Sequence, residues 1–457
     1  MKLKYRRILY ITFIIAFFVI TSITIIYAAG YSYNFKKGRV EKTGILYLES
    51  FPKNADIFIN GKYEGKTPKR FTRLLPDTYF VQVTKDGYYP WQQDLGVQSN
   101  LTTFSRDIVL FKKTLPINLI EGDINIFKTA PSQEKIIYSK LSEKDEELRL
   151  YNIKTGTDFL IKSFGRQTYN NLEFVRWSPS QNKALFRQTV GDFNKYLIID
   201  ADTLKIKDLF DITRLNFDDV VWDENNDNYL YGLRKSVLYQ IDLFDNSTTS
   251  LLSANIQDIQ VRNQSLYYIT KTGRESYLNK NILENKTVSE TEKIKLPDQS
   301  QFSFKESVTG FLTLQDHRTG DLFIINDDSF STADIADDII LQDKAQQVVW
   351  SVELGKILYY TDFEIWIFDT KTKEKDLITR FGEEIKQVLW YPKHNYIIYQ
   401  TKNSIRIIEA KEYDTKNNIE LTSLETIDSM TIDNSGNNLY FKGKIGNQSG
   451  VYRLEIQ

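Results

Sequence analysis

The chain has 457 residues, enough for more than one folded domain. Its 59 Lys and Arg residues balance 60 Asp and Glu residues, so no basic surface for nucleic acid is indicated. With no cysteine and only two histidines, disulfides, thiolate metal sites, thiol catalysis and a three-histidine zinc site are excluded. The 28 Tyr and 28 Phe residues favour strands. We therefore expect a mainly β protein that binds no nucleic acid.

A basic tail precedes a long apolar segment at the N-terminus. Residues 1–7 carry four positive side chains, and residues 8–29 contain no charged residue. As a helix, the second segment would extend roughly 33 Å, enough to cross the hydrocarbon layer of a membrane. It is longer than the apolar part of a signal peptide, and Ile26 and Tyr27 interrupt a small-residue cleavage pattern. We predict a transmembrane anchor in contact with the lipid bilayer, with the basic tail cytoplasmic and the remaining domains extracytoplasmic. A cleaved signal peptide is the alternative.

A polar linker is expected at residues 30–43, followed by a small β domain at residues 44–112. Asn60-Gly61 between two apolar runs indicates a hairpin. Four motifs occur in order: Phe51-Pro52-Lys53-Asn54-Ala55-Asp56-Ile57-Phe58-Ile59-Asn60-Gly61, Gly65-Lys66-Thr67-Pro68, Leu74-Leu75-Pro76-Asp77-Thr78-Tyr79-Phe80-Val81 and Gly87-Tyr88-Tyr89-Pro90-Trp91. Together they resemble the PEGA domain, although its Pro-Glu-Gly-Ala is here Pro52-Lys53-Asn54-Ala55. The resemblance implies a small β-sandwich of surface and envelope proteins, without catalytic residues.

Three aromatic residues near the end of this domain are candidates for a partner surface. They are Tyr88, Tyr89 and Trp91. The alternative is that they pack on the small sandwich itself.

Residues 113–457 contain a repeated unit of short strands. The expected first strands end near Phe127, Trp177, Trp222, Val261, Phe304, Trp350, Trp390 and Ile432. Spacings of about 40–50 residues with several short strands per unit are typical of a β-propeller. The turn Trp177-Ser178-Pro179-Ser180-Gln181-Asn182 resembles the Trp-Ser-Pro-Asp-Gly turn of TolB-like and WD-repeat-like propellers. We predict eight blades, with seven as the alternative because residues 331–338 make a poor fourth strand.

The last unit provides only three strands, whereas a spare strand-like segment, Leu115 to Ile120, precedes the first unit. If this segment pairs in the last blade, the ring closes and no long sheet edge is exposed. We predict this closure.

No catalytic or metal-binding constellation emerges. Four carboxylate doublets lie at expected strand ends or loops: Asp218-Asp219, Asp223-Glu224, Asp327-Asp328 and Asp337-Asp338. Neighbours along a strand point to opposite faces, so a doublet is not the facing pair that a glycosidase needs. Asp223-x-Asn225-x-Asp227 begins like a calcium loop but lacks the glycine and the bidentate glutamate, so an ordinary turn is expected.

His317 and His394 fall in expected loops, and the chain has no G-x-S-x-G motif. The tryptophans that recur at one repeat position are expected to pack between blades. We therefore predict no catalytic residues, no metal and no cofactor.

The function we expect is that of a membrane-anchored binding or scaffold protein of the prokaryotic cell envelope, and not of an enzyme. Its PEGA-like and propeller domains would dock an envelope protein or a cell-wall glycan. The alternatives are an extracytoplasmic propeller enzyme acting on glycans and a structural cell-wall component. A cluster of carboxylates with raised pKa values at the mouth of the central channel would favour the enzyme.

Overall fold

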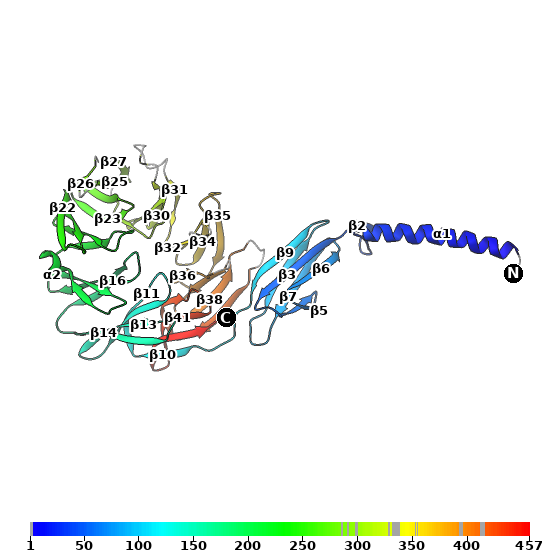
Figure 1. Ribbon diagram of the computed structural model, residues 1–457, viewed down its shortest axis with the longest axis horizontal. Helices are drawn as coiled ribbons and strands as arrows, with labels where there is room; N and C mark the ends of the chain where they lie inside the picture. The colour runs from blue at the N-terminus through cyan, green and yellow to red at the C-terminus, as the bar shows by residue number, and fades with distance from the viewer. Residues whose placement is uncertain are drawn as a thin grey trace.

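The computed structural model describes residues 3–284, 287–289, 292–297, 300–327, 330, 339–351, 353, 355–392, 396–411 and 416–457. It contains an N-terminal helix, a small β domain and a ring of sheets (Figure 1). Three of the features singled out above, Asp328, the segment 331–338 and His394, lie outside the described residues.

Helix α1 (Leu3–Ala28) extends away from the rest of the chain (Figure 1). Its segment Arg6–Ala28 has a mean hydropathy of 2.5 and is not covered by other parts of the chain. It is therefore long and apolar enough to cross a membrane. The helix also satisfies its polar side chains internally, because the Thr12 and Thr24 hydroxyls donate to carbonyls one turn earlier.

A hairpin follows the helix where the sequence predicted only a polar linker. Strand β1 (Tyr31–Asn34) pairs antiparallel with β2 (Arg39–Lys42). Gly30, at φ +82°, has the left-handed conformation that commonly ends a helix. The Thr43 backbone N–H and hydroxyl both donate to the Gly30 carbonyl, which fixes the base of the hairpin to the helix end.

The small β domain is a sandwich of two sheets. Asn60 and Gly61 both have positive φ, which confirms the predicted tight hairpin. The two sheets enclose a core that includes Leu48, Val81 and Trp91. One sheet has the order β6 (Lys69–Leu74), β3 (Gly44–Phe51), β9 (Thr102–Val109), and the other β5 (Lys62–Lys66), β4 (Asp56–Ile59), β7 (Asp77–Thr84), β8 (Trp91–Val97).

Eight sheets follow, here called blades one to eight. Their strands pair in chain order, except that the fourth and fifth strands of blade four both pair with its third strand and that blade eight is completed by a strand from before blade one. The predicted first-strand ends are confirmed within about two residues. Helix α2 (Leu209–Thr213) joins blades two and three. Blade one has β11 (Asp123–Thr129), β12 (Lys135–Leu141), β13 (Asp145–Asn152) and β14 (Thr157–Gly165); blade two has β15 (Asn171–Trp177), β16 (Lys183–Val190), β17 (Phe193–Asp200) and β18 (Ile206–Asp208); blade three has β19 (Asp219–Trp222), β20 (Tyr229–Arg234), β21 (Val237–Asp242) and β22 (Ser247–Ser253); blade four has β23 (Ile256–Arg262), β24 (Ser265–Thr272), β25 (Glu275–Glu284), β26 (Thr287–Val288) and β27 (Glu292–Leu296).

The remaining blades include the weakest repeat unit, blade five, whose fourth strand is β31 and begins only after the segment 331–338. Blade five has β28 (Phe302–Phe304), β29 (Phe311–Asp316), β30 (Asp321–Asn326) and β31 (Ile339–Lys344); blade six has β32 (Gln347–Ser351), β33 (Lys356–Tyr360), β34 (Glu364–Asp369) and β35 (Lys375–Arg380); blade seven has β36 (Gln387–Trp390), β37 (Tyr396–Gln400), β38 (Ser404–Glu409) and β39 (Asn418–Ser423); blade eight has β40 (Thr426–Ile432), β41 (Asn438–Ile445) and β42 (Gln448–Glu455).

The ring closes as predicted, because β10 (Ile117–Glu121) pairs with β42 and completes blade eight. Ile117 lies opposite Arg453, and Glu121 lies opposite Gly450. A Cβ atom added at Gly450 would lie 2.1 Å from the Ile120 carbonyl oxygen, so only glycine fits this close approach.

Each blade packs on the next through its own buried apolar cluster, including the contact of blade eight with blade one. At that last contact, Ile124 and Tyr138 of blade one pack with Tyr440 and Val451 of blade eight. The ring is thus continuous and has eight blades, the first of the two predicted counts. The recurring tryptophans belong to these clusters, as expected from their repeat position.

Candidate functional site

A cavity of about 380 Å³ opens at the centre of the ring. The first strands of the blades line this centre, since β15 contacts β11 and β19, and β23 contacts β19 and β28. The cavity lies where these strands end. Pro131 of blade one, Trp177 of blade two, Trp222 of blade three and Glu306 of blade five all border it. Because blades on opposite sides of blade three border one cavity, it forms a mouth of the central channel.

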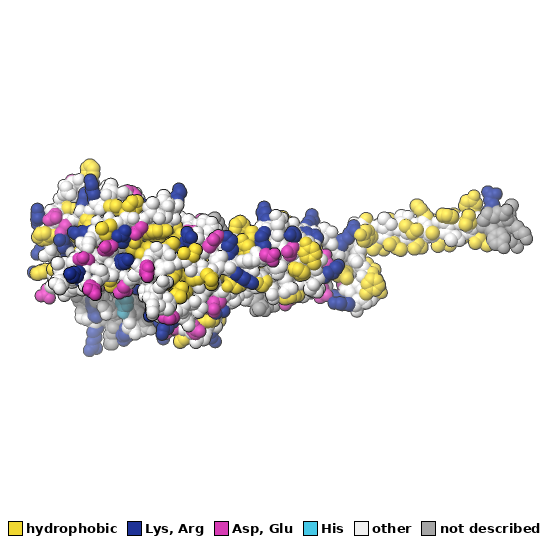
Figure 2. Space-filling model, turned by 90° about the horizontal axis from the view of Figure 1, so that it is seen from below, with side chains coloured by type: hydrophobic (Ala, Val, Ile, Leu, Met, Phe, Trp, Pro, Cys, Tyr) yellow, Lys and Arg dark blue, Asp and Glu magenta, His cyan; other side chains and the backbone are white. Residues whose placement is uncertain are grey.

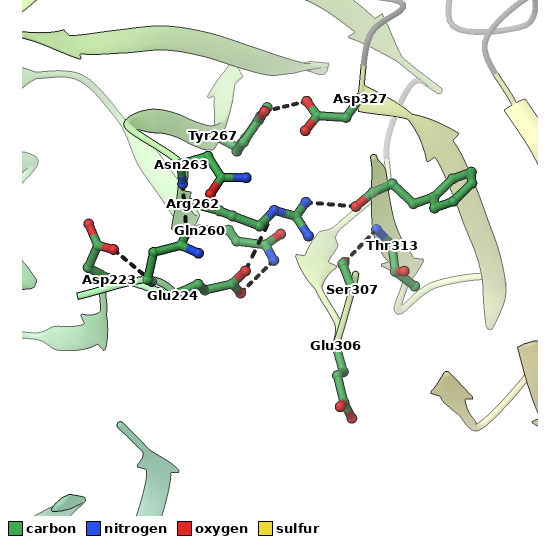
Figure 3. Close-up of polar contacts among 12 residues, drawn as sticks. Asp223, Glu224, Gln260, Arg262, Asn263, Tyr267, Glu306, Ser307, Thr313 and Asp327 are labelled. Carbon is green, nitrogen blue, oxygen red and sulfur yellow. Dashed lines mark hydrogen bonds and ion pairs between the residues drawn. The ribbon is translucent and has the colours of Figure 1, made fainter. Parts of the chain in front are cut away.

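Glu224 organises the polar contacts at this mouth (Figure 3). Its backbone N–H donates to the Val261 carbonyl, which holds the residue against the end of β23. Gln260 Nε2 donates to Glu224 Oε1 at 2.7 Å, and Arg176 Nη1 donates to the same oxygen at 3.3 Å. Arg262 Nε lies 3.7 Å from Glu224 Oε2. Two guanidinium groups therefore offset the charge of this carboxylate.

Arg262 links blades four and five. Its side chain is only 4% exposed, and Nη2 donates to the Phe311 carbonyl at 2.7 Å. In Figure 3 it extends between Glu224 and the strand that carries Thr313. Its Nε and Nη1 atoms have no hydrogen-bond partner among the described residues. The buried guanidinium depends on Glu224 for charge balance, which makes Glu224 a structural requirement of the mouth.

Besides Asp223, whose pKa is also raised by burial, three further carboxyl groups near the channel have raised pKa values. Burial raises the pKa of Asp258 to about 6, and the charge of Asp219 adds to the rise. Burial likewise raises the pKa of Asp219. Glu306 reaches water in the channel, but the surrounding protein still desolvates its carboxyl and raises its pKa, while Arg176 opposes the rise.

Two of these three carboxyls accept hydrogen bonds from the backbone of the propeller. Asp258 Oδ2 accepts a 2.6 Å hydrogen bond from the Phe304 backbone N–H, which clamps β23 to β28. Asp219 accepts a backbone hydrogen bond from Val220. Glu306 stands apart from the network in Figure 3, and its side chain makes no hydrogen bond or close ion pair within the described ranges. One carboxylate, and not a facing pair, is therefore available to a ligand.

The tryptophans differ in the partners of their indole nitrogens. Trp350 Nε1 donates to the Glu306 carbonyl at 2.9 Å, and Trp390 Nε1 donates to the Val349 carbonyl at 3.1 Å, each in the preceding blade. Trp177 Nε1 and Trp222 Nε1 are buried and have no acceptor in the described part of the chain. Both of these residues border the cavity. Buried donors are normally paired, but these two nitrogens are covered by protein and do not face the open space of the cavity.

The predicted partner residues lie against the chain's own propeller. Trp91 is 2% exposed, and its Nε1 donates to Glu409 Oε1 of blade seven at 2.6 Å. Tyr89 packs against the cluster that joins the β-sandwich to blades seven and eight. Tyr88 packs on the sandwich core. The alternative stated from the sequence, packing on the sandwich, therefore describes both Tyr88 and Trp91, and the indole nitrogen of Trp91 in addition binds the propeller.

The contact between the two domains extends well beyond Trp91. The Phe111 ring packs edge-on against the rings of Tyr391 and Tyr396, each 5.4 Å away. Lys411 Nζ lies 2.8 Å from Asp107 Oδ2 at the rim. This mixture of buried aromatic and polar contacts fixes the sandwich on blades seven and eight.

The other residues considered from sequence occupy ordinary turns. Asp223 Oδ1 accepts hydrogen bonds from the backbone N–H groups of Asn225 and Asn226, as in an Asx turn. His317 Nε2 lies 2.8 Å from the Ser303 hydroxyl on an exposed loop. Within the described ranges, no group of three His, Cys, Asp or Glu side chains is placed to hold a metal. The sequence did not identify Glu306, Arg176 and Arg262, because these residues come together only when the first strands of the blades pack around the centre of the ring.

These features define the class of protein: a PEGA domain followed by an eight-bladed β-propeller, with an apolar N-terminal helix. Residues 43–114 match the PEGA domain, in agreement with the range 44–112 expected from the motifs. Comparison with curated proteins gives no match.

Among solved structures, similarity is found to three propeller-containing proteins at the level of the fold. The Dos1 propeller is 11% identical, with 75% of this chain and 95% of that chain covered and a TM-score of 0.49. A eukaryotic initiation factor is 11% identical, with 73% and 85% covered and a TM-score of 0.49. Dihydro-heme d1 dehydrogenase NirN in complex with DHE is 12% identical, with 72% and 75% covered and a TM-score of 0.49.

Proposed function

We propose that this chain is a membrane-anchored, extracytoplasmic binding protein of the cell envelope. Helix α1 anchors it, the PEGA domain holds the propeller at a fixed orientation, and the channel mouth binds an envelope ligand. The ligand we infer carries an amino group for the carboxylate of Glu306. An amino-bearing glycan and a lysine-bearing protein segment both satisfy this description.

The proposal rests on a polar group of the cavity wall, the Glu306 carboxylate, that is not used by the fold. Glu306 borders the cavity, and its carboxylate has no hydrogen bond or close ion pair among the described residues. Arg176 is near enough for its charge to act on Glu306, but its ion pair, at 3.3 Å, is with Glu224. A polar pocket with a few convergent groups in a central opening is the usual form of a ligand site.

We also propose that the protein is not an enzyme, because Asp258 is committed to the Phe304 backbone and Asp219 to that of Val220. One specific observation favours the second candidate, an enzyme acting on glycans: Asp258, Asp219 and Glu306 all have raised pKa values near the channel. A raised pKa is what a general acid requires. The binding proposal is preferred because a glycosidase needs two available carboxyls.

The test is ligand capture by full-length protein purified in detergent from its native envelope. Mass spectrometry of the bound fraction should show one peptide or glycan with the wild type and with the control Glu425→Gln, a glutamate exposed on blade eight. Glu306→Gln should lose it while melting at the same temperature as the wild type. Equal capture by Glu306→Gln would contradict the site, and glycan turnover that depends on Glu306 would favour the enzyme.

The anchoring is tested separately by adding protease to intact spheroplasts. Digestion of the PEGA and propeller domains, leaving a short membrane-bound fragment, would agree with the proposed orientation. Complete protection would contradict it.

A further inference from the structure

The hairpin after helix α1 has one aromatic face. In the register of β1 and β2, Tyr31 lies opposite Lys42 and Tyr33 lies opposite Val40. Side chains alternate along a strand, so these four residues share one face. Phe35 at the turn joins them, with its ring 4.9 Å from that of Tyr33. Phe35 is 88% exposed, Val40 52% and Tyr33 47%, so the aromatic face is largely uncovered.

The opposite face of the hairpin is polar and internally paired. Asn34 Nδ2 donates to Glu41 Oε2 at 2.8 Å, and Arg39 Nε donates to Glu41 Oε1 at 2.6 Å. The Asn34 side chain also accepts hydrogen bonds from the backbone N–H groups of Lys36 and Lys37. These contacts give the turn a fixed shape. Lys37 Nζ lies 3.6 Å from Glu41 Oε1 and Lys36 Nζ lies 3.5 Å from Asp77 Oδ2, yet the Lys36 side chain remains 86% exposed and the Lys37 side chain 48%.

The hairpin cannot move far from the end of helix α1. Only Ala29 and Gly30 separate the helix from β1, and Thr43 binds the Gly30 carbonyl twice. On the domain side, the Arg73 guanidinium lies 3.7 Å from the centre of the Tyr27 ring. In Figure 2 the hydrophobic side chains of the helix continue onto a cluster at its base, beside basic side chains. If α1 spans a bilayer, the hairpin therefore lies at the surface of that bilayer.

We propose that residues 31–42 form a second membrane contact, with Tyr33, Phe35 and Val40 in the interfacial layer and Lys36 and Lys37 on anionic phospholipid headgroups. The inference rests on the proposed membrane anchoring. Aromatic rings favour the boundary between headgroups and acyl chains. Lysines close to an anionic lipid surface are attracted to it.

The bilayer is a better occupant of this face than a second protein copy. Ala29 and Gly30, the two residues between the helix and the hairpin, extend over at most about 7 Å. The aromatic face is therefore held close to the bilayer that surrounds the helix end, and lipid is nearer to it than a second copy of the chain. A two-stranded hairpin has little stability alone, and lipid contact would support it. With the helix as one contact and the hairpin as another, the PEGA domain would be held at a fixed tilt to the membrane. The Lys36–Asp77 ion pair, at 3.5 Å, continues this connection into the domain.

The experiment uses the absence of native cysteine. Phe35→Cys and a distant control on the propeller, Asp192→Cys, are labelled with an environment-sensitive fluorophore in the full-length protein. Each is placed in nanodiscs of phosphatidylcholine, with or without phosphatidylglycerol, that contain lipids with quencher-labelled acyl chains. We expect a blue shift and strong quenching at position 35 only, and weaker quenching when Lys36→Ala and Lys37→Ala are combined in anionic nanodiscs.

The outcomes separate this inference from the proposed anchoring. A protein that does not enter nanodiscs would overturn the anchoring. A protein that enters them but keeps an aqueous, unquenched label at position 35 would overturn the hairpin contact alone. A blue-shifted label that lipid quenchers do not reach would show that another copy of the chain covers the face, and would also overturn the contact with lipid.

Discussion

Glu409 is the residue on which the contact between the PEGA domain and the propeller most depends. Its side chain is 3% exposed. Oε1 accepts hydrogen bonds from Trp91 Nε1 at 2.6 Å and from the Tyr396 hydroxyl at 3.2 Å. Oε2 accepts from Gln93 Nε2 at 3.2 Å and from both the backbone and side-chain nitrogens of Asn417, at 3.2 and 2.9 Å. We expect Glu409→Ala to weaken the domain contact severely.

The magnitude follows from the donors that the substitution would leave behind. Each buried donor without an acceptor costs about 1–3 kcal/mol, and a buried charged group holds its partners more strongly than a neutral one. The five donors will not add, because water can enter the space that the carboxylate leaves. A total loss of about 3–5 kcal/mol is expected, comparable to breaking a buried charged network. Glu409→Gln keeps both shape and one acceptor, so it should lose about half as much.

The assay measures distances between spin labels at Asp94→Cys on the sandwich and Asp192→Cys on the propeller, in an otherwise cysteine-free chain. The wild type should give one narrow distance distribution, and Glu409→Ala a broad one with a lower melting temperature. Glu425→Ala, which removes an exposed glutamate of blade eight, should change neither. An unchanged narrow distribution for Glu409→Ala would refute the reasoning, because the domains would then be held without this carboxylate.

Four further substitutions test the ring and its centre. Gly450→Ala should lower the melting temperature by several degrees, because its Cβ would lie 2.1 Å from a carbonyl oxygen of β10; Gly382→Ala, with nothing within 4 Å, should not, and equal melting would argue against closure by β10. Asp258→Asn should change the pH dependence of stability. The pKa of Asp258 is raised from 3.8 to about 6 in the folded state, so the wild type loses up to about 3 kcal/mol as pH rises from 4 to 6. The variant lacks this loss. The melting temperature of the variant minus that of the wild type should therefore rise between pH 4 and 6 and then stay level. A difference that does not change with pH would contradict the raised pKa of Asp258. Trp390→Phe should lose about 1 kcal/mol with its hydrogen bond to the Val349 carbonyl. Trp222→Phe should lose more, because Trp222 is 1% exposed and the smaller ring leaves a cavity between blades two and three; a smaller loss than for Trp390→Phe would contradict this packing.

The sequence could predict the architecture because its signals are local. Apolar runs ending at residues such as Trp222 and Trp390 mark one strand of each blade, and Asn60-Gly61 marks a hairpin by the positive φ that those residues tolerate. Closure by β10 could also be inferred, since an incomplete last unit and a spare strand leave one simple solution. The hairpin at 31–42 was missed because its strands are only four residues long and mix aromatic with charged residues.

The channel mouth could be predicted only in part. The sequence singled out Trp177, Trp222 and the doublet Asp223-Glu224, but not that they meet Arg176 and Glu306, because these residues are separated in the chain and share no motif. Arg176 and Glu306 lie in blades two and five, and they approach one another only because the first strands of the blades meet in the centre of the ring. The role of Trp91 was hidden for a related reason. An aromatic residue at a strand start can pack within its own domain alone or also bind another, and only the position of Glu409 decides between them.

Ring closure and domain docking use the same short stretch of chain. After the last strand of the sandwich, the Lys112 backbone N–H donates to the Ile456 carbonyl at 3.0 Å, and the Gln457 side chain donates back to the Leu110 carbonyl at 2.6 Å. A few residues later the chain enters blade eight as β10. The edge of blade eight therefore holds the PEGA domain and closes the ring at once. It follows that Gly450→Ala should broaden the distribution of distances between the labels on the two domains and also destabilise the propeller. Glu409→Ala should broaden the same distribution but leave the ring closed.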